Sequence, residues 1–478
     1  MRDGKLGVWL LTALVVGNMV GSGIFMLPRQ LAGVASPAGS VLAWALTGAG
    51  VMMIALVFGN LAMRKPELAG GPQMYAKALF RDGSTASTLA GYLVSWGYWV
   101  ANWAGNVAII TTFAGYLSTF FPVLNDTTPL FFAGPFTVSV GNLVTFFVCT
   151  ALLWLVHGLI LRGVENAGRV NLVATSAKVI GFVFFIAVSL FVFHKANIVP
   201  FAAVKSDGGQ TFGLFGQAGH ALVSTLWAFV GVESAVVFSA RARRQGDIKR
   251  ATVLGLVLTV IIYMSISILT MGVLPQSQLV HTDKPLVDTL SVAIGPVGSY
   301  VMALVGIVCL AGSTVGWVLL SAEVAYQASR QGLFPSAFGR ENRRKSPVVS
   351  LTITNIMAQA FIFSTISHSI AKAFDFVTFV ATLSYLVPYI IATVYQLKLT
   401  MSGETYGGQG RQRIGDLVIA ALGVIYSAWV VKAGTADLHT FLFGVGLIFC
   451  GIFFFPFVIS SRRRQQTSTA MKKGGSAA

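Results

Sequence analysis

The sequence predicts an all-α membrane protein with twelve transmembrane helices, and its composition is the first reason. Of its 478 residues, 55% are hydrophobic and only 10% are charged, with a mean hydropathy of +0.76. A soluble domain carries about 25% charged residues. Apolar runs of roughly 18 residues or more, long enough to cross a bilayer, recur along the chain. The first run lacks a signal-peptide cleavage pattern, so we expect it to be a span.

The twelve predicted spans are residues 6–31, 38–63, 89–121, 137–160, 170–193, 218–239, 251–273, 298–326, 347–365, 376–397, 414–431 and 438–459. With the N-terminus placed in the cytoplasm, the basic residues on the external side are Arg29, Lys195, Lys205, Lys284, Lys372 and Lys432. Apart from one in a span, the remainder of the 33 Lys and Arg fall on the cytoplasmic side. This bias predicts that both termini are cytoplasmic.

The same charge distribution excludes one class of partner and indicates another. The net charge of +17 lies mainly in the predicted cytoplasmic loops, where it orients the spans and faces lipid headgroups, so we expect no nucleic-acid partner. The predicted partner is the lipid bilayer, and the predicted location is a plasma membrane, the inner membrane of a bacterium. The three cysteines have neither metal-site nor disulfide spacing, so no metal or cofactor is expected.

The first span contains an interruption in the stretch GNMVGSGIFMLP, residues 17–28. Gly21, Ser22 and Gly23 lie where a membrane helix should be continuous, and two glycines around a serine weaken a helix. In hydrocarbon, free backbone groups persist only where they are buried in protein or line a cavity. The alternative is a notch for close helix packing, a role that small residues also serve.

A second interruption is predicted in the sixth span, in LWAFVGVESA, where Gly231 precedes Glu233 by two residues. Two broken segments at corresponding places in two halves mark the substrate site of secondary transporters. The first and sixth spans run in opposite directions, so an inverted repeat is predicted, with halves 6–193 and 218–397. Residues 414–459 would add two helices and 460–478 a basic cytoplasmic tail, all within one transporter domain, 1–478.

Polar residues at membrane depth supply further candidates. In the third span, Trp99, Asn102, Trp103 and Asn106 share one helix face, which suits a cationic or polar side chain. The alternative is an aromatic packing face with hydrogen bonds between helices. Lys178 lies about two turns into the fifth span and is a functional candidate because ionisable residues at depth are costly. The alternative is that Lys178 snorkels to the interface.

The chain resembles the amino acid–polyamine–organocation (APC) superfamily, and within it the basic amino acid/polyamine antiporters, including the arginine/agmatine and arginine/ornithine exchangers. The resemblance covers nearly the whole chain and rests on GNMVGSGIFMLP, YWVANWAGN, LWAFVGVESA, GSTVGWVLL, ASRQGLFP and LVPY. It implies a leucine-transporter-like 5+5 inverted repeat plus two helices. The implied activity is not enzymatic: it is exchange of arginine or lysine against ornithine or a related amine, by alternating access and without a cofactor.

The resemblance also implies roles for individual residues. The substrate carboxylate would meet the Gly21–Gly23 turn, and its ammonium would meet carbonyls of the first and sixth spans. The implied substrate-contacting residues are Val20, Gly21, Ser22, Gly23, Tyr98, Asn102, Asn106, Trp227, Ala228, Phe229, Val230, Trp317, Ala381 and Thr382. The implied gating residues, which would close the route to the substrate, are Tyr98, Trp227, Glu233 and Tyr389.

Three positions depart from the arginine/agmatine exchanger. Ala381 replaces a serine and Asn102 replaces a cysteine, which leaves the side-chain pocket open to other substrates. Lys178 resembles the fifth-helix lysine of relatives in which an ammonium takes the place of a sodium ion, and it would act as that substitute or as a proton carrier.

Two rival functions remain at this point. A proton-coupled symporter of neutral amino acids would use Lys178 as its proton carrier. A substrate-sensing receptor or a channel is disfavoured because the sequence contains neither a soluble sensory domain nor a pore-lining ring of charge. A homodimer formed through the last two helices is also expected.

Overall fold

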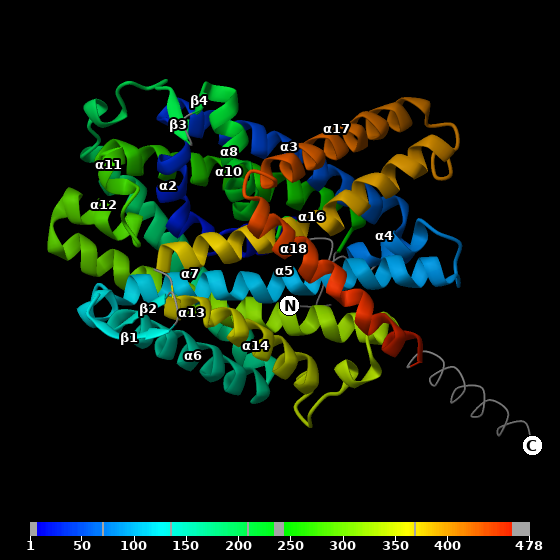
Figure 1. Ribbon diagram of the computed structural model, residues 1–478. Helices are drawn as coiled ribbons and strands as arrows, with labels where there is room; N and C mark the ends of the chain where they lie inside the picture. Colours follow the sequence, from blue (N-terminus) through cyan, green and yellow to red (C-terminus); the bar gives the residue numbers. More distant parts are fainter. Residues whose placement is uncertain are drawn as a thin grey trace, which may run out of the picture.

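The computed structural model describes residues 7–68, 71–133, 136–207, 210–233, 243–367 and 370–460, and this part of the chain is mostly α-helical (Figure 1). The long helices are α3 (Pro37–Arg64), α5 (Thr85–Leu117), α6 (Val140–Leu161), α7 (Val164–Phe191), α10 (Gln245–Val273), α13 (Pro296–Arg330), α14 (Val348–Ile362), α16 (Ile370–Ser402) and α17 (Gly410–Gly434). Shorter helices include α1 (Val8–Met19), α2 (Gly23–Val34), α4 (Pro72–Ala78), α8 (Leu214–Ala228) and α18 (Leu438–Cys450).

Within the described residues, eight helices are long and apolar enough to cross a membrane, or nine spans if the bent pair α1 and α2 counts as one. These coincide with nine of the twelve predicted spans. The other three predictions fall on α5, α7 and α8. The Trp, Asn and Ser residues of α5 lower its mean hydropathy. The apolar part of α7 is only Ser176–Phe191, and α8 ends at Ala228, so both apolar segments are shorter than a span.

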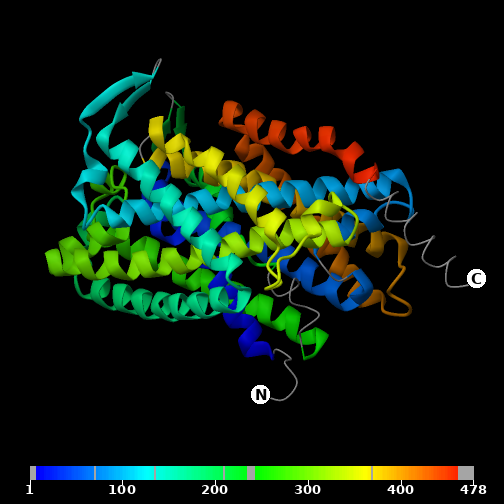
Figure 2. The same cartoon turned by 90° about the horizontal axis from the view of Figure 1, so that it is seen from below.

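The helices run side by side, with α5 near the centre of the bundle against α16 and α13 (Figures 1 and 2). Its buried residues form most of its length, from Ser87 to Tyr116, and its small side chains let the neighbouring helices approach closely. Helix α18 lies at the edge of the bundle and keeps many apolar side chains exposed. A wide apolar periphery around a packed interior is typical of a protein surrounded by lipid.

Two β-hairpins lie at one end of the bundle, at the left of Figure 1. They are the hairpin β1 (Pro129–Ala133) with β2 (Phe136–Ser139) and the hairpin β3 (Lys205–Asp207) with β4 (Gln210–Phe212). The short helices α11 (Gln276–Leu279) and α12 (Pro285–Ile294) lie there too. Lys205 and Lys284, both predicted external, donate at this end to the Ala32 carbonyl and the Thr119 hydroxyl.

The remaining elements are one-turn helices or short segments of the connections: η1 (Pro66–Leu68), η2 (Pro122–Asn125), η3 (Lys195–Ile198), η5 (Ser336–Gly339), α15 (Ser364–Ser367) and η6 (Gly451–Phe454).

A buried acidic side chain in α17, Asp416, was not among the candidates predicted from the sequence. The carboxylate of Asp416 accepts hydrogen bonds from Asn60 Nδ2 at 2.9 Å, Arg64 Nε at 3.0 Å and the Tyr406 hydroxyl at 2.9 Å. The Arg64 guanidinium also lies 3.7 Å from the centre of the Tyr406 ring. These polar contacts hold α17 against α3.

Candidate functional site

The first predicted interruption is present between α1 and α2. Helix α1 ends at Met19, α2 begins at Gly23, and the two axes are bent by 51°. Ser22 precedes α2 as its N-cap residue but makes no capping bond with its side chain, and its buried hydroxyl lacks a partner among the described residues. The first turn of a helix presents unpaired N–H groups and partial positive charge. This end of α2 can therefore receive a carboxylate.

The second interruption follows α8, which ends at Ala228 and continues as a turn through Glu233. Gly231 has a φ of +103°, a conformation that side chains with a Cβ rarely adopt. A methyl group added at Gly231 would lie 3.1 Å from the Asn18 carbonyl carbon, so the glycine also allows the two interruptions to touch. The rest of the predicted sixth span, 234–239, lies outside the described residues.

The two interruptions also meet at Gly23, the first residue of α2. A methyl group added at Gly23 would lie 3.4 Å from both the Ala228 Cα and the Trp227 ring. Gly21 faces Trp317, whose Nε1 would lie 3.9 Å from a methyl group there. The structure thus brings together residues of the first, sixth and eighth predicted spans at one place.

Tyr263, which the sequence analysis missed, joins the two interruptions. Its buried hydroxyl on α10 lies 2.7 Å from the Met19 carbonyl and 2.9 Å from the Ala228 carbonyl, the last residues of α1 and α8. A hydroxyl carries one proton, so it donates to one carbonyl at a time. The available signal was a lone tyrosine in the apolar run LTVIIYMSI.

Lys178 extends from α7 to the C-terminal end of α1. Its Nζ donates to the Val20 carbonyl at 2.5 Å, the Gly17 carbonyl at 3.3 Å and the Ser313 hydroxyl at 3.1 Å. Only 5% of the residue is exposed. The ammonium lies at the negative end of the α1 dipole and links α1 to both α7 and α13. Lys178 therefore does not reach to the interface as a snorkelling lysine would.

Glu233 is held by two tyrosines from different helices. Its Oε1 accepts a bond from the Tyr98 hydroxyl of α5 at 3.0 Å, and its Oε2 accepts from the Tyr389 hydroxyl of α16 at 2.8 Å. The Gly231 N–H also donates to Oε2, at 3.1 Å. Glu233, Tyr98 and Tyr389, three of the four predicted gating residues, are all buried, and each tyrosine contacts Glu233 directly. They connect the turn after α8 with the two helices that flank it.

The remaining aromatic gating candidate, Trp227, packs against α5. A methyl group added at Gly105 would lie 2.8 Å from the edge of the Trp227 ring, so the absence of a side chain there makes room for the indole. Trp227 is 7% exposed and lies at the last turn of α8, next to the second interruption. Its ring therefore packs on α5 at Gly105, which lies between Asn102 and Asn106 in the sequence.

The two asparagines of α5 each use their amide nitrogen within the protein. Asn102 Nδ2 donates to the Tyr98 carbonyl at 2.6 Å, and Asn106 Nδ2 donates to the Ser321 hydroxyl at 3.0 Å. Both Oδ1 atoms are buried without a hydrogen-bond partner in the described part of the chain. An unpaired buried acceptor is costly. The two oxygens are thus available to a ligand that supplies N–H donors.

Four other predicted contacts lie in the turn after α8 or in α16. Phe229 and Val230 lie in the buried turn, and the Phe229 carbonyl accepts the Val232 N–H at 3.1 Å. Ala381 and Thr382 are buried in α16, where the Thr382 hydroxyl donates to the Thr378 carbonyl of its own helix. The Thr382 hydroxyl proton is therefore already used within α16.

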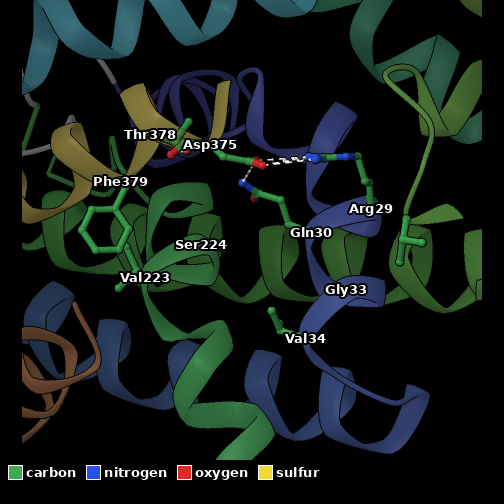
Figure 3. A pocket seen from close by; sticks show the side chains of 10 residues that line it. Arg29, Gln30, Gly33, Val34, Val223, Ser224, Asp375, Thr378 and Phe379 are labelled. Carbon is green, nitrogen blue, oxygen red and sulfur yellow. Dashed lines mark hydrogen bonds and ion pairs between the residues drawn. The ribbon is translucent and has the colours of Figure 1, made fainter. Parts of the chain in front are cut away.

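A cavity of about 290 Å³ lies between α2, α8, α11 and α16 (Figure 3). It does not contain the interruptions themselves. Val223 and Ser224 line it on α8, and Thr378 lines it on α16, each about one helical turn before Trp227 or Thr382. The cavity is therefore adjacent to the candidate site along the same helices.

Comparison with known proteins gives a consistent result. The family described as Amino acid permease matches residues 6–471. A Bacillus subtilis protein named "Putative arginine/ornithine antiporter" is 51% identical over 463 residues, covering 97% of this chain and 98% of the relative. An "Arginine/ornithine antiporter" of Pseudomonas aeruginosa is 35% identical, covering 90% and 86%. Another of that name, from Latilactobacillus sakei, is 31% identical, covering 91% and 86%.

Proposed function

The chain belongs to the amino acid permease family, and from this membership we propose that it is an antiporter exchanging cationic amino acids, arginine or lysine against ornithine or a related amine. The observation that carries the proposal is the 51% identity to the Bacillus subtilis relative over 97% of the chain. The resemblance noted in the sequence analysis is confirmed. The protein is a multi-pass membrane protein, and its substrates are small molecules.

The geometry supports a particular orientation of the substrate within this proposal. The carboxylate would lie at the first turn of α2, near Ser22, where N–H groups and a hydroxyl converge. The cationic side chain would lie toward α5, where Asn102 Oδ1 and Asn106 Oδ1 lack donors among the described residues. Trp227 and Trp317 would contact the aliphatic part and the face of the guanidinium.

We propose gating and coupling roles for the remaining polar residues. Glu233, Tyr98 and Tyr389 would close the route on one side, because their mutual hydrogen bonds join the turn after α8 to α5 and α16. Lys178 would take the place of a sodium ion by joining α1 to α7 and α13. The substrate ammonium would use the α8 carbonyls or the second lone pair of the Val20 carbonyl, whose first lone pair is engaged by Lys178.

The finer architecture is also part of the proposal. Twelve spans would comprise two inverted five-helix repeats, 6–193 and 218–397, and two further helices in 414–459, with both termini and the tail 460–478 in the cytoplasm. The interruptions after Met19 and after Ala228, in the first helix of each half, support the repeat. The exposed apolar side chains of α18 support its burial in lipid or against a second copy.

The experiment is uptake of labelled arginine into proteoliposomes, with empty vesicles compared with vesicles loaded with ornithine at equal pH. An exchanger takes up arginine only into loaded vesicles. Labelled alanine and serine, with an imposed proton gradient, form the parallel arm. Entry of the neutral amino acids into empty vesicles, without arginine uptake, would replace the proposal with proton-coupled symport. Entry of arginine into empty vesicles at the rate seen in loaded ones would also contradict exchange.

A further inference from the structure

The cavity beside the interruptions contains an ion pair that the proposed transport mechanism has not used. Arg29 of α2 donates from Nη1 to Asp375 Oδ1 at 3.1 Å and from Nη2 to Oδ2 at 3.2 Å (Figure 3). Gln30 Nε2 donates to the same carboxylate at 2.6 Å. The cluster joins α2 to α16 at the predicted external end. It lines the cavity that borders the candidate site along α8 and α16.

The two partners of the ion pair are unequally exposed. The Asp375 side chain is 40% exposed, whereas the Arg29 side chain is 15% exposed. The Asp375 carboxylate is therefore the more accessible of the two charges. A solute that carries its own guanidinium or ammonium can compete with Arg29 for Asp375, whereas one without a spare cation cannot.

Gln30 supplies a second acceptor beside Asp375. Its Oε1 is buried and makes no hydrogen bond to any residue that the structure describes. A guanidinium has five N–H donors in a planar fork, so it can donate to both carboxylate oxygens and to a third oxygen nearby. Leaving Oε1 unpaired costs free energy that a bound guanidinium would recover.

Arg29 has a second carboxylate nearby to which it can turn. Asp283 lies in the connection between α11 and α12. Its pKa is raised by burial, and the positive charge of Arg29 acts in the opposite direction. The positive charge of Arg29 thus acts on Asp283 over a distance, while its printed ion pair among the described residues is with Asp375. Asp283 would remain an opposite charge in the neighbourhood after release of Asp375.

The position and size of the cavity fit a single amino acid on its way inward. Val223 is four residues before Trp227 on α8, about 6 Å at 1.5 Å per residue. The volume, about 290 Å³, is at the lower limit of small-molecule pockets, about 300–1,000 Å³. The cavity thus offers room for one amino acid about one helical turn outside the interruptions.

From these observations we propose that Asp375 and Gln30 form an outer binding site for the cationic side chain of the incoming amino acid, which displaces Arg29 from Asp375. This inference rests on the proposed exchange of cationic amino acids and adds an outer step to it. Displacement of Arg29 removes the ion pair between α2 and α16 and leaves the hydrogen bond from Gln30 Nε2 to Asp375. Entry is thereby favoured for cationic over neutral amino acids before the substrate reaches the inner site.

The test compares two variants that break the same ion pair from opposite sides. Initial rates of labelled arginine uptake are measured in right-side-out vesicles loaded with ornithine, over a range of external arginine. Asp375→Asn should raise the external KM about tenfold or more, as expected when one charged hydrogen-bonding group is removed. Arg29→Gln should lower the external KM because Asp375 is left free. Gln30→Leu should raise KM by a smaller factor.

The controls separate the outer site from structural damage and from failure of the proposed function. Asp126→Asn, a change at a partly exposed acidic residue outside the cavity, should leave KM unchanged. The outer site is refuted if Asp375→Asn and Arg29→Gln shift KM in the same direction, or if they change only the maximal rate. Either result would mean that the ion pair only holds α2 and α16 together. If Asp375→Asn does not fold, Arg29→Gln and Gln30→Leu decide by the same opposite shifts. Absence of arginine exchange by the unaltered protein would instead reject the proposed function.

Discussion

Replacement of Lys178 by methionine tests the link between α1 and its neighbours. Methionine keeps a similar length but has no donor, so the bonds to the carbonyls of Val20 and Gly17 and to the Ser313 hydroxyl are lost. A bond from a charged donor contributes about 1.5–3 kcal/mol, and the long bond to Gly17 less. The ammonium's desolvation cost, which methionine avoids, offsets part of this sum.

The net loss is about 2–4 kcal/mol for the conformation in which the link is formed. At about 1.4 kcal/mol per factor of ten, this shifts the conformational equilibrium about 30- to 700-fold. We therefore expect K178M to lose most arginine–ornithine exchange in loaded proteoliposomes and to unfold at a lower temperature. The matched control is K398M, because Lys398 also donates to a carbonyl, that of Leu79, but lies exposed. Normal exchange and an unchanged unfolding temperature in K178M would refute the assigned role.

Three further predictions concern the interruptions. E233Q and Y389F should each slow exchange about tenfold or more, because each weakens a charge-assisted hydrogen bond. Y385F is the control and should retain wild-type rates, since the buried Tyr385 hydroxyl has no partner among the described residues. Equal rates in Y389F and Y385F would contradict the gating role. W227L should abolish uptake while the solubilised protein stays monodisperse, with W9L as the exposed control; unchanged uptake would remove Trp227 from the gate. G231A should lower the free energy of unfolding by about 1–3 kcal/mol, because alanine is strained at φ +103° and would contact Asn18; the unfolding temperature should fall. G219A in α8, with open space around it, should be neutral or stabilising. Equal unfolding temperatures for the two alanine variants would refute this prediction.

The parts of the site that the sequence predicted are those with a local signal. Gly21, Ser22 and Gly23 interrupt an apolar run, and α1 and α2 do break there. Lys178 and Glu233 are charges in apolar runs, and both are buried and hydrogen-bonded. Each of these signals is a residue type that a continuous membrane helix disfavours, so its position can be read without knowing the neighbours.

The parts that the sequence analysis missed depend on which helices become neighbours. Arg29 and Asp375 are 346 positions apart, and each alone reads as an ordinary charge near the end of a span. Tyr263 lies in an apolar run, and only the packing of α10 against α1 and α8 brings its hydroxyl to two helix ends. Asp416 was passed over for the same reason. Pairing between distant segments leaves no trace in the periodicity of one sequence.

The contacts at the two interruptions give the candidate site a fixed polarity. The C-terminal end of α1 is occupied, because the Met19 and Val20 carbonyls accept bonds from Tyr263 and Lys178. The N-terminal end of α2 is open, because Ser22 makes no capping bond with its side chain. In the proposed orientation the substrate carboxylate would lie at the first turn of α2, and its side-chain cation would lie at the unpaired Oδ1 atoms on α5. A substrate with a cation at the far end of its side chain would satisfy both ends at once, and a neutral amino acid would satisfy only one.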